Sequence, residues 1–302
     1  MRKNSTENTL KSYNEPGLRS GAAWLAEALL FSSIFISCCA FLLTVETYML
    51  AGLEVSVPMA IFVFLATLFT YNLSSVQSMI RRPRQKINRF DASWVQRHKP
   101  WLAILGLLSI LSATYIYFAY GLRLNFWFVV HLAIISIGYT VPFIYKTKRV
   151  KPLRSVPLLK VFLIAYVWAV VTALFPLLDA GLPLWSGEAW LLFARRFLFI
   201  LALALLFDIR DYTYDRQTNT LTFPGLIGVR NTKLLSMSLL LLYVVVAAST
   251  EDGATRIALL ISGVGAALVV MFSSENKPRV YYALLADGAM LLHAALIYLA
   301  KS

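Results

Sequence analysis

Nine runs of apolar residues, each about long enough to cross a bilayer, follow one another along the chain. About 20 apolar residues in a helix span the hydrocarbon core, and a spanning segment must satisfy its own backbone hydrogen bonds there. We therefore predict an all-α polytopic membrane protein of nine transmembrane helices, with a cytoplasmic N-terminal tail (1–20) and a single transmembrane domain (21–302). The runs cover residues 22–44, 57–80, 101–120, 125–145, 157–178, 189–207, 234–250, 255–272 and 280–300.

The composition supports a membrane protein. Of 302 residues, 59% are hydrophobic and only 14% are charged, which is too apolar for a soluble chain of this length. Cys38 and Cys39 are the only cysteines, and they are adjacent within an apolar run. This placement excludes a disulfide framework and argues against redox chemistry. Residues 1–20 are polar and the next run is too long for a signal-peptide core, so we expect no cleavable signal peptide.

The basic residues indicate how the helices are oriented. If the N-terminus is cytoplasmic, the cytoplasmic segments carry 23 of the 28 lysines and arginines. The positive-inside rule therefore predicts a cytoplasmic N-terminus and a C-terminus on the opposite side, in the cytoplasmic membrane if the chain is bacterial. Orientation accounts for the net charge of +13, so no nucleic-acid partner is needed. The outer connections carry acids instead, namely Glu46, Glu54, Asp179, Glu188, Glu251 and Asp252.

Arg195 and Arg196 are exceptions, because they fall inside the sixth apolar run. We interpret residues 184–194 as a segment along the outer interface and expect the span itself to begin near Arg195. His293 also lies within a span, and no metal-ligand spacing surrounds it, so we interpret it as a structural histidine.

Three aspartates mark the end of the sixth apolar run. Asp208, Asp211 and Asp215 are spaced by three and four residues, which puts all three carboxylates on one helical face. The carboxylates repel one another and crowd a helix C-terminus, where the macrodipole disfavours anions. A divalent cation relieves both costs, and Mg²⁺ prefers such hard oxygen ligands together with substrate phosphates. The alternatives are a solvated helix end, or pairing of Asp208 with Arg210 or with a neighbouring helix.

The predicted topology brings two basic loops to the same side as the aspartates. Carboxylates for a metal, with lysines and arginines nearby, suit the binding of a diphosphate. The loops cover residues 81–100 and 146–160. Membrane orientation and contact with anionic lipid explain the same basic residues without any ligand.

The aspartate stretch resembles a motif of the UbiA superfamily of intramembrane prenyltransferases. The family pattern is Asp-x-x-Asp-x-x-x-Asp at a helix end, then a short loop and a Thr-Leu-Pro-like stretch that ends in glycine. Residues 208–215 and 220–228 fit that pattern, although Phe223 interrupts the Thr-Leu-Pro part. The stretch from Tyr139 to Lys146 also looks like the end of the family's fourth helix. The nine spans and the cytoplasmic N-terminus fit the family over nearly the whole chain.

The chain departs from the family at the end of the second span. The family carries Asn-Asp-x-x-Asp-x-x-x-Asp there, and the two motifs together hold two metals on one diphosphate. Asn72 is present, but Leu73, Val76 and Ile80 stand where the acids are expected. The resemblance then implies a single Mg²⁺ on the three aspartates with help from Asn72. Arginines that follow would replace the charge of the missing metal, and these are Arg81, Arg82 and Arg84.

The resemblance implies transfer of an isoprenoid group from a prenyl diphosphate to an aromatic or lipid acceptor. Asp208, Asp211 and Asp215 are then the catalytic and metal-binding acids. The implied diphosphate ligands are Arg81, Arg82, Arg84 and Lys146, and Tyr139, Tyr212 and Tyr214 are candidates for the substrate pocket.

Two other classes of function stay open. The chain could bind a prenyl diphosphate or another lipid without turning it over, since three acids of the first motif are missing. It could also be a transporter, as nine spans and a possible internal repeat allow. The transporter is weaker, because the acids lie at the membrane surface and charges in the middle of the spans are scarce.

Overall fold

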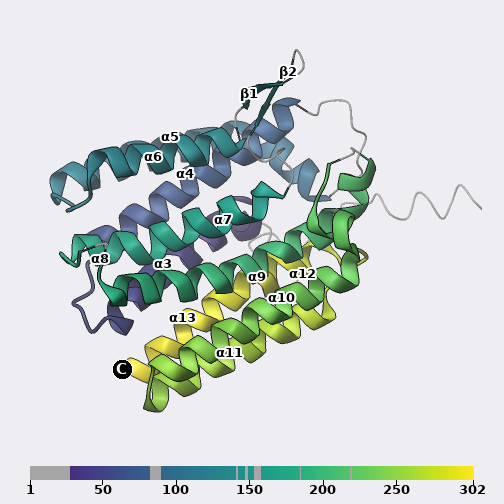
Figure 1. Ribbon diagram of the computed structural model, residues 1–302. Helices are drawn as coiled ribbons and strands as arrows, with labels where there is room; N and C mark the ends of the chain where they lie inside the picture. Colours follow the sequence, from purple (N-terminus) through teal and green to yellow (C-terminus); the bar gives the residue numbers. More distant parts are fainter. Residues whose placement is uncertain are drawn as a thin grey trace, which may run out of the picture.

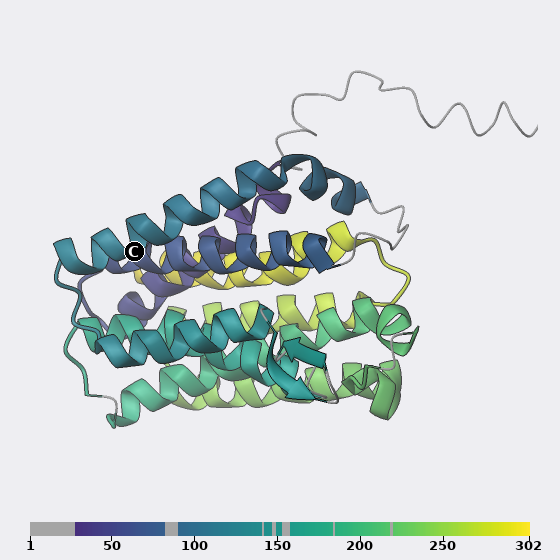
Figure 2. The same ribbon diagram turned by 90° about the horizontal axis from the view of Figure 1, so that it is seen from above.

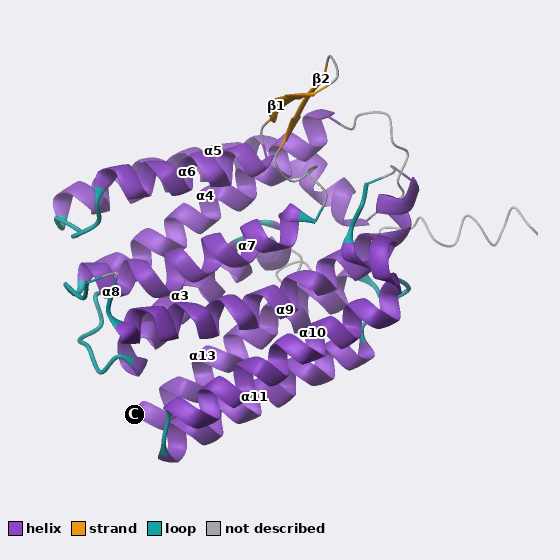
Figure 3. Cartoon of the chain, viewed as in Figure 1, coloured by secondary structure: helices purple, strands orange, loops and turns teal. Residues whose placement is uncertain are grey.

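The computed structural model describes the backbone of residues 28–81, 90–140, 142–146, 149–152, 158–183, 185–217 and 220–302. Side chains are described for these residues except 77–81, 90–93, 140, 142–146, 149–152 and 279. The described chain is a bundle of long helices with one short β-hairpin (Figure 3). The expected all-α architecture is therefore confirmed for the bundle, and the hairpin is an addition to it.

The helices follow the apolar runs of the sequence. Two of them contain a π-helical turn, η2 (Val170–Leu174) and η3 (Tyr282–Ala286), so that α7–η2–α8 and α12–η3–α13 each form one rod. The helices are α3 (Ile34–Leu50), α4 (Val57–Arg81), α5 (Phe90–Ala119), α6 (Phe126–Thr140), α7 (Leu159–Ala169), α8 (Phe175–Asp179), α9 (Gly187–Gln217), α10 (Phe223–Thr250), α11 (Gly253–Phe272), α12 (Arg279–Tyr281) and α13 (Asp287–Lys301).

Seven helical segments of the described residues are long and apolar enough to cross a membrane. Two further apolar helices, Ile34–Leu50 and Phe126–Tyr139, are shorter. Each of these nine segments overlaps one of the nine apolar runs, although Ile34–Leu50 begins and ends later than the predicted 22–44 and Phe223–Thr250 begins before the predicted 234–250. The count of nine spans stays a prediction. The seven longer segments are Val57–Val76, Trp94–Ala119, Leu159–Asp179, Gly187–Gln217, Phe223–Thr250, Gly253–Phe272 and Tyr282–Lys301.

Successive rods run in opposite directions, so the chain crosses the bundle back and forth (Figures 1 and 2). The ends of α4, α6 and α9 and the beginnings of α7 and α10 meet at one end of the bundle, on the right in Figure 1. We call this the aspartate end, because Asp208, Asp211 and Asp215 lie there on α9. The C-terminus lies at the opposite end.

The fourth run is shorter than the sequence indicated. We expected a span over 125–145, but α6 ends at Thr140 and strand β1 (Pro142–Lys146) begins after it. Pro142 explains the correction, since the residue before a proline is disfavoured in helical conformation and helices usually end there. Strand β1 pairs antiparallel with β2 (Arg149–Pro152), and the hairpin projects from the aspartate end (Figure 1).

Helix α9 corrects two further expectations. It is continuous from Gly187 to Gln217, so the interfacial segment predicted for 184–194 is wrong for the described residues from 187 on. Arg195 and Arg196 are buried inside the bundle rather than marking a span edge. Glu46, predicted in an outer connection, is likewise buried within α3. These charges are tolerated there because acids and arginines pair with one another.

A glycine allows α10 and α11 to approach closely. A Cβ added to Gly263 would lie 2.6 Å from Cγ2 of Val244, a branched side chain that has little freedom to move. Small residues at such crossings let membrane helices pack together. We expect Gly263→Ala to lower the free energy of unfolding by about 1–3 kcal/mol through overpacking. Thermal denaturation in detergent measures this, and Gly288→Ala, which meets no atom within 4 Å, should show no loss.

Candidate functional site

The candidate site begins with the last turns of α9. Asp208, Asp211, Tyr212 and Asp215 repeat at helical spacing, so all four belong to one face. Asp208 and Asp215 are buried, whereas Asp211 keeps about a quarter of its side-chain surface accessible. The predicted alignment of the three acids therefore follows from an unbroken helix.

Lys160, near the beginning of α7, pairs with the first aspartate. Its Nζ lies 2.8 Å from Oδ1 of Asp208 and donates a hydrogen bond to it. The Asp208 side chain is 2% exposed, so the ammonium group compensates a carboxylate that has almost no contact with solvent. Of the alternatives left open by the sequence, Asp208 thus takes the partner on a neighbouring helix and not Arg210.

Arg210 pairs with the second aspartate. Its Nε and Nη2 donate to the two carboxylate oxygens of Asp211 at 3.0 and 2.9 Å, a forked geometry. The guanidinium carbon also lies 5.0 Å from the ring centre of Phe207 and 6.0 Å from that of Tyr282. Arg210 is therefore fixed between α9 and η3, within electrostatic range of Asp287 at the start of α13.

Other helices bring aromatic and amide groups toward this end. Tyr139 is the second-last residue of α6, whose end lies at the aspartate end of the bundle (Figure 1). Tyr71 on α4 accepts a hydrogen bond of 3.2 Å from Nε1 of Trp168 on α7, and the two rings meet edge to face. Tyr212 shares the aspartate face, whereas Tyr214 does not, by helical spacing.

Asn72 is 1% exposed, and both polar atoms of its amide lack a hydrogen-bond partner among the described residues. Its Cβ lies against Gly106 of α5, where an added Cβ would be 3.6 Å away. A buried amide without a hydrogen-bond partner is costly. A polar ligand or a water molecule bound to Asn72 would therefore explain this side chain better than packing does.

The side chains of all four predicted diphosphate ligands lie outside the described part of the structure. Arg82 and Arg84 are outside the described residues. Arg81 is the last residue of α4 and Lys146 the last of β1, and only their backbones are described. The ends of α4 and β1 do lie at the aspartate end of the bundle (Figure 1).

Among the described residues, sequence reasoning missed two cations that pair with the aspartates. Lys160 was counted only as one charge of a basic loop, and Arg210 was considered only as a partner of Asp208. Both keep about a quarter or less of their side-chain surface accessible. The resulting site alternates acidic and basic side chains at one end of an apolar bundle. Such a site suits a phosphate ligand that arrives with a cation, because the basic groups can bind the phosphate and the acids can bind the cation.

The acids alone do not form a ready-made metal centre. In the described part of the chain, no group of three or more His, Cys, Asp or Glu side chains is placed to hold a metal ion. Two of the three aspartates have cations as partners instead. Mg²⁺ typically uses one or two protein carboxylates and completes its coordination with water and substrate phosphates. The residues present therefore fit a Mg²⁺ ion that arrives with a diphosphate.

Solved structures of UbiA homologues share the architecture of this chain. No protein-family model and no curated protein matches the sequence. A UbiA homologue from Archaeoglobus fulgidus bound to GPP and Mg²⁺ aligns with a TM-score of 0.60 and 13% identity, over 91% of this chain and 99% of that one. A digeranylgeranylglyceryl phosphate synthase aligns with a TM-score of 0.52 and 13% identity, over 92% and 96%.

A third structure, the apo form of a UbiA homologue from Aeropyrum pernix K1, aligns with a TM-score of 0.50 and 16% identity. It covers 91% of this chain and 95% of its own. Identities this low establish the fold and not the activity. The resemblance noted in residues 208–228 is therefore confirmed at the level of the fold. The chain is an integral membrane protein with the fold of the UbiA superfamily of prenyltransferases.

Proposed function

We propose that this chain binds a prenyl diphosphate at the aspartate end of the bundle and transfers its isoprenoid group to an aromatic or lipid acceptor. The single observation that carries the proposal is the face of α9, where Asp208 and Asp211 meet Lys160 and Arg210 inside a UbiA-like bundle. The fold adds support, because a structure that shares it holds the prenyl diphosphate GPP with Mg²⁺.

Mg²⁺ is the implied cofactor, and Asp208, Asp211 and Asp215 are the residues that would hold it, with Asn72 assisting. When bound, the ion neutralises the negative charge of the diphosphate and so stabilises it as a leaving group. Two of the carboxylates must exchange their present cations for the ion. Lys160 and Arg210 then become available to the phosphate oxygens, in the roles that we also propose for Arg81, Arg82, Arg84 and Lys146.

The reaction needs little covalent chemistry from the protein. The bond between the allylic carbon and the diphosphate oxygen breaks, and its electron pair leaves with the diphosphate. The allylic carbon then forms a bond with the acceptor, which releases a proton. We propose that the apolar wall of the bundle excludes water from the allylic cation and that the rings of Tyr139 and Tyr212 stabilise its positive charge.

A non-catalytic binder of the same ligands is the second candidate. It is favoured by α4, where Leu73 and Val76 occupy positions at which the family carries acids. A bundle with one acid motif keeps ligands for a diphosphate but lacks those for a second metal. Such a protein would hold a prenyl diphosphate or a related lipid without releasing inorganic diphosphate.

The test is binding of radiolabelled GPP to purified protein in detergent, with Mg²⁺ and with EDTA. Release of inorganic diphosphate is then followed with a panel of aromatic and lipid acceptors. We expect saturable binding that requires Mg²⁺, and release of diphosphate with at least one acceptor. Binding without release under any acceptor would favour the non-catalytic candidate. No binding, or binding that ignores EDTA, would reject the metal-assisted site.

A further inference from the structure

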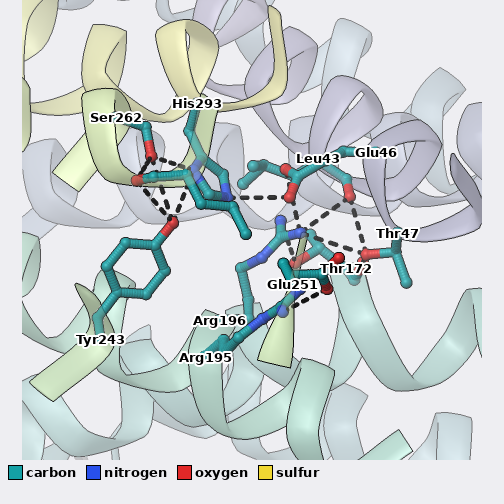
Figure 4. A network of polar contacts seen from close by, with 11 residues as sticks. Leu43, Glu46, Thr47, Thr172, Arg195, Arg196, Tyr243, Glu251, Ser262 and His293 are labelled. Atoms are coloured by element: carbon teal, nitrogen blue, oxygen red, sulfur yellow. Dashed lines mark hydrogen bonds and ion pairs between the residues drawn. The ribbon is translucent and has the colours of Figure 1, made fainter. Parts of the chain in front are cut away.

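A second group of charged side chains lies deep in the bundle, away from the aspartate end (Figure 4). Its centre is Arg196 of α9, which is 4% exposed. Nη2 of Arg196 donates to the backbone oxygen of Leu43 at 3.3 Å and to Oγ1 of Thr47 at 3.2 Å, and lies 3.2 Å from Oε2 of Glu46. Nη1 donates to Oγ1 of Thr172 in η2 at 3.4 Å. One guanidinium therefore contacts a full turn of α3 and a turn of the α7–η2–α8 rod.

Through Glu46 this arginine is connected to three more helices. Its Oε1 lies 2.9 Å from Nε2 of His293 on α13. Nδ1 lies 2.9 Å from Oγ of Ser262 on α11 and 3.4 Å from Oη of Tyr243 on α10. The network thus links six rods, and Figure 4 shows its side chains pointing toward one another.

Stability alone does not explain the presence of such a network. Replacing a buried ion pair by apolar residues of similar size is often neutral or stabilising, whereas buried charges fix the relative position of helices in some proteins. Membrane helices also lack a hydrophobic driving force between them, since lipid is as apolar as leucine. Segment 197–207 of α9 consists only of Phe, Leu, Ile and Ala. Apolar packing of such a segment therefore distinguishes poorly between the correct position of α9 along its axis and positions shifted by a residue.

The position of Arg196 is transmitted directly to the candidate site. Asp208 follows it by 12 residues on one continuous helix, a separation of about 18 Å along the axis. A slip of α9 by one residue moves Asp208 by about 1.5 Å. That distance is enough to break both the 2.8 Å contact with Lys160 and the contacts of Arg196 with α3.

We propose that Arg196 and Glu46 are positioning residues, which fix the axial position of α9 so that its aspartates meet Lys160. Neither residue needs to touch a ligand, because both act through the helix. The consequence for ligand binding rests on the proposed function, whereas the positioning of Asp208 against Lys160 does not. The two ideas therefore require separate measurements.

The primary test is a double-mutant cycle on Lys160 and Asp208, which uses no ligand. Lys160→Met, Asp208→Asn and the double variant are compared by melting temperature in detergent. The cycle is measured in the wild-type background and again with Glu46→Leu and Arg196→Met together, an apolar pair chosen to retain the fold. We expect clear coupling in the wild type and none with the apolar pair. Unchanged coupling would overturn the proposal.

A matched control removes the neighbouring ion pair of the same helix. Nη1 of Arg195 donates a hydrogen bond of 2.6 Å to Oε1 of Glu251, directly after the end of α10. Arg195→Met with Glu251→Leu should leave the coupling between Lys160 and Asp208 intact. If the control abolishes it as well, loss of any buried charge suffices and the specific role of Arg196 is rejected.

Two further measurements keep the test decisive. If the apolar pair does not fold, Thr47→Val with Thr172→Val removes two partners of Arg196 without leaving a buried carboxylate unpaired, and weaker coupling is again expected. GPP binding with Mg²⁺ should weaken about 10-fold or more with the apolar pair, since misplacement by about 1 Å has effects of this size. Lost coupling with no GPP binding by wild-type protein would support the positioning role and reject the proposed function.

Discussion

Replacing Asp211 by asparagine is expected to weaken Mg²⁺-dependent binding of GPP by about 100-fold or more. Asparagine has nearly the shape of aspartate but no charge, so the proposed site loses an anionic metal ligand. Mutation of a residue that only supports a metal ligand already lowers metal affinity about 10- to 100-fold, and loss of a ligand itself should cost more. The substitution also releases Arg210 from its forked pair with Asp211. Equilibrium binding of labelled GPP at several Mg²⁺ concentrations measures the effect.

Asp252→Asn is the matched control for this prediction. Asp252 lies at the opposite end of the bundle, before α11, and its side chain is 96% exposed. The same change of charge there should leave GPP binding unaltered. Equal affinity of wild type and Asp211→Asn, at matched melting temperatures, would show that Asp211 is not a metal ligand and that the α9 face is an ordinary helix end.

Removing the ammonium group of Lys160 is expected to lower the melting temperature, and addition of Mg²⁺ with GPP is expected to restore part of it. Lys160→Met leaves the carboxylate of Asp208 buried without its partner, which costs about 3 kcal/mol in such pairs. If Asp208 also binds the ion, Mg²⁺ and GPP together compensate the carboxylate. The melting temperature should therefore rise more on their addition in the variant than in the wild type.

The double variant Lys160→Met/Asp208→Asn separates the two parts of this prediction. Both charges are gone, so most of the lost stability should return without any ligand. Mg²⁺ and GPP should then shift the melting temperature less than in Lys160→Met. Equal shifts in the single and double variants would mean that Asp208 only pairs with Lys160 and takes no part in binding metal.

Local properties of the sequence determined most of the architecture. Hydropathy located the helical segments, because a spanning helix must be apolar over a fixed length. Helical spacing placed Asp208, Asp211 and Asp215 on one face, because that geometry depends only on the turn of the helix. The local signals failed at boundaries, as when Pro142 ended α6 early and Arg196 was taken to mark a span edge.

Only the tertiary structure decided which charges meet. Lys160 reaches Asp208 across 48 residues of sequence. Arg196 meets Thr47 across 149 residues, and His293 of α13 completes the pair at Glu46 of α3. Hydropathy treats each of these residues as an isolated charge, and an isolated charge in an apolar run indicates a span edge or an interface. Packing of separate helices instead supplies the opposite charge for Asp208, Glu46 and Arg196, because a buried charge is stable only beside a partner.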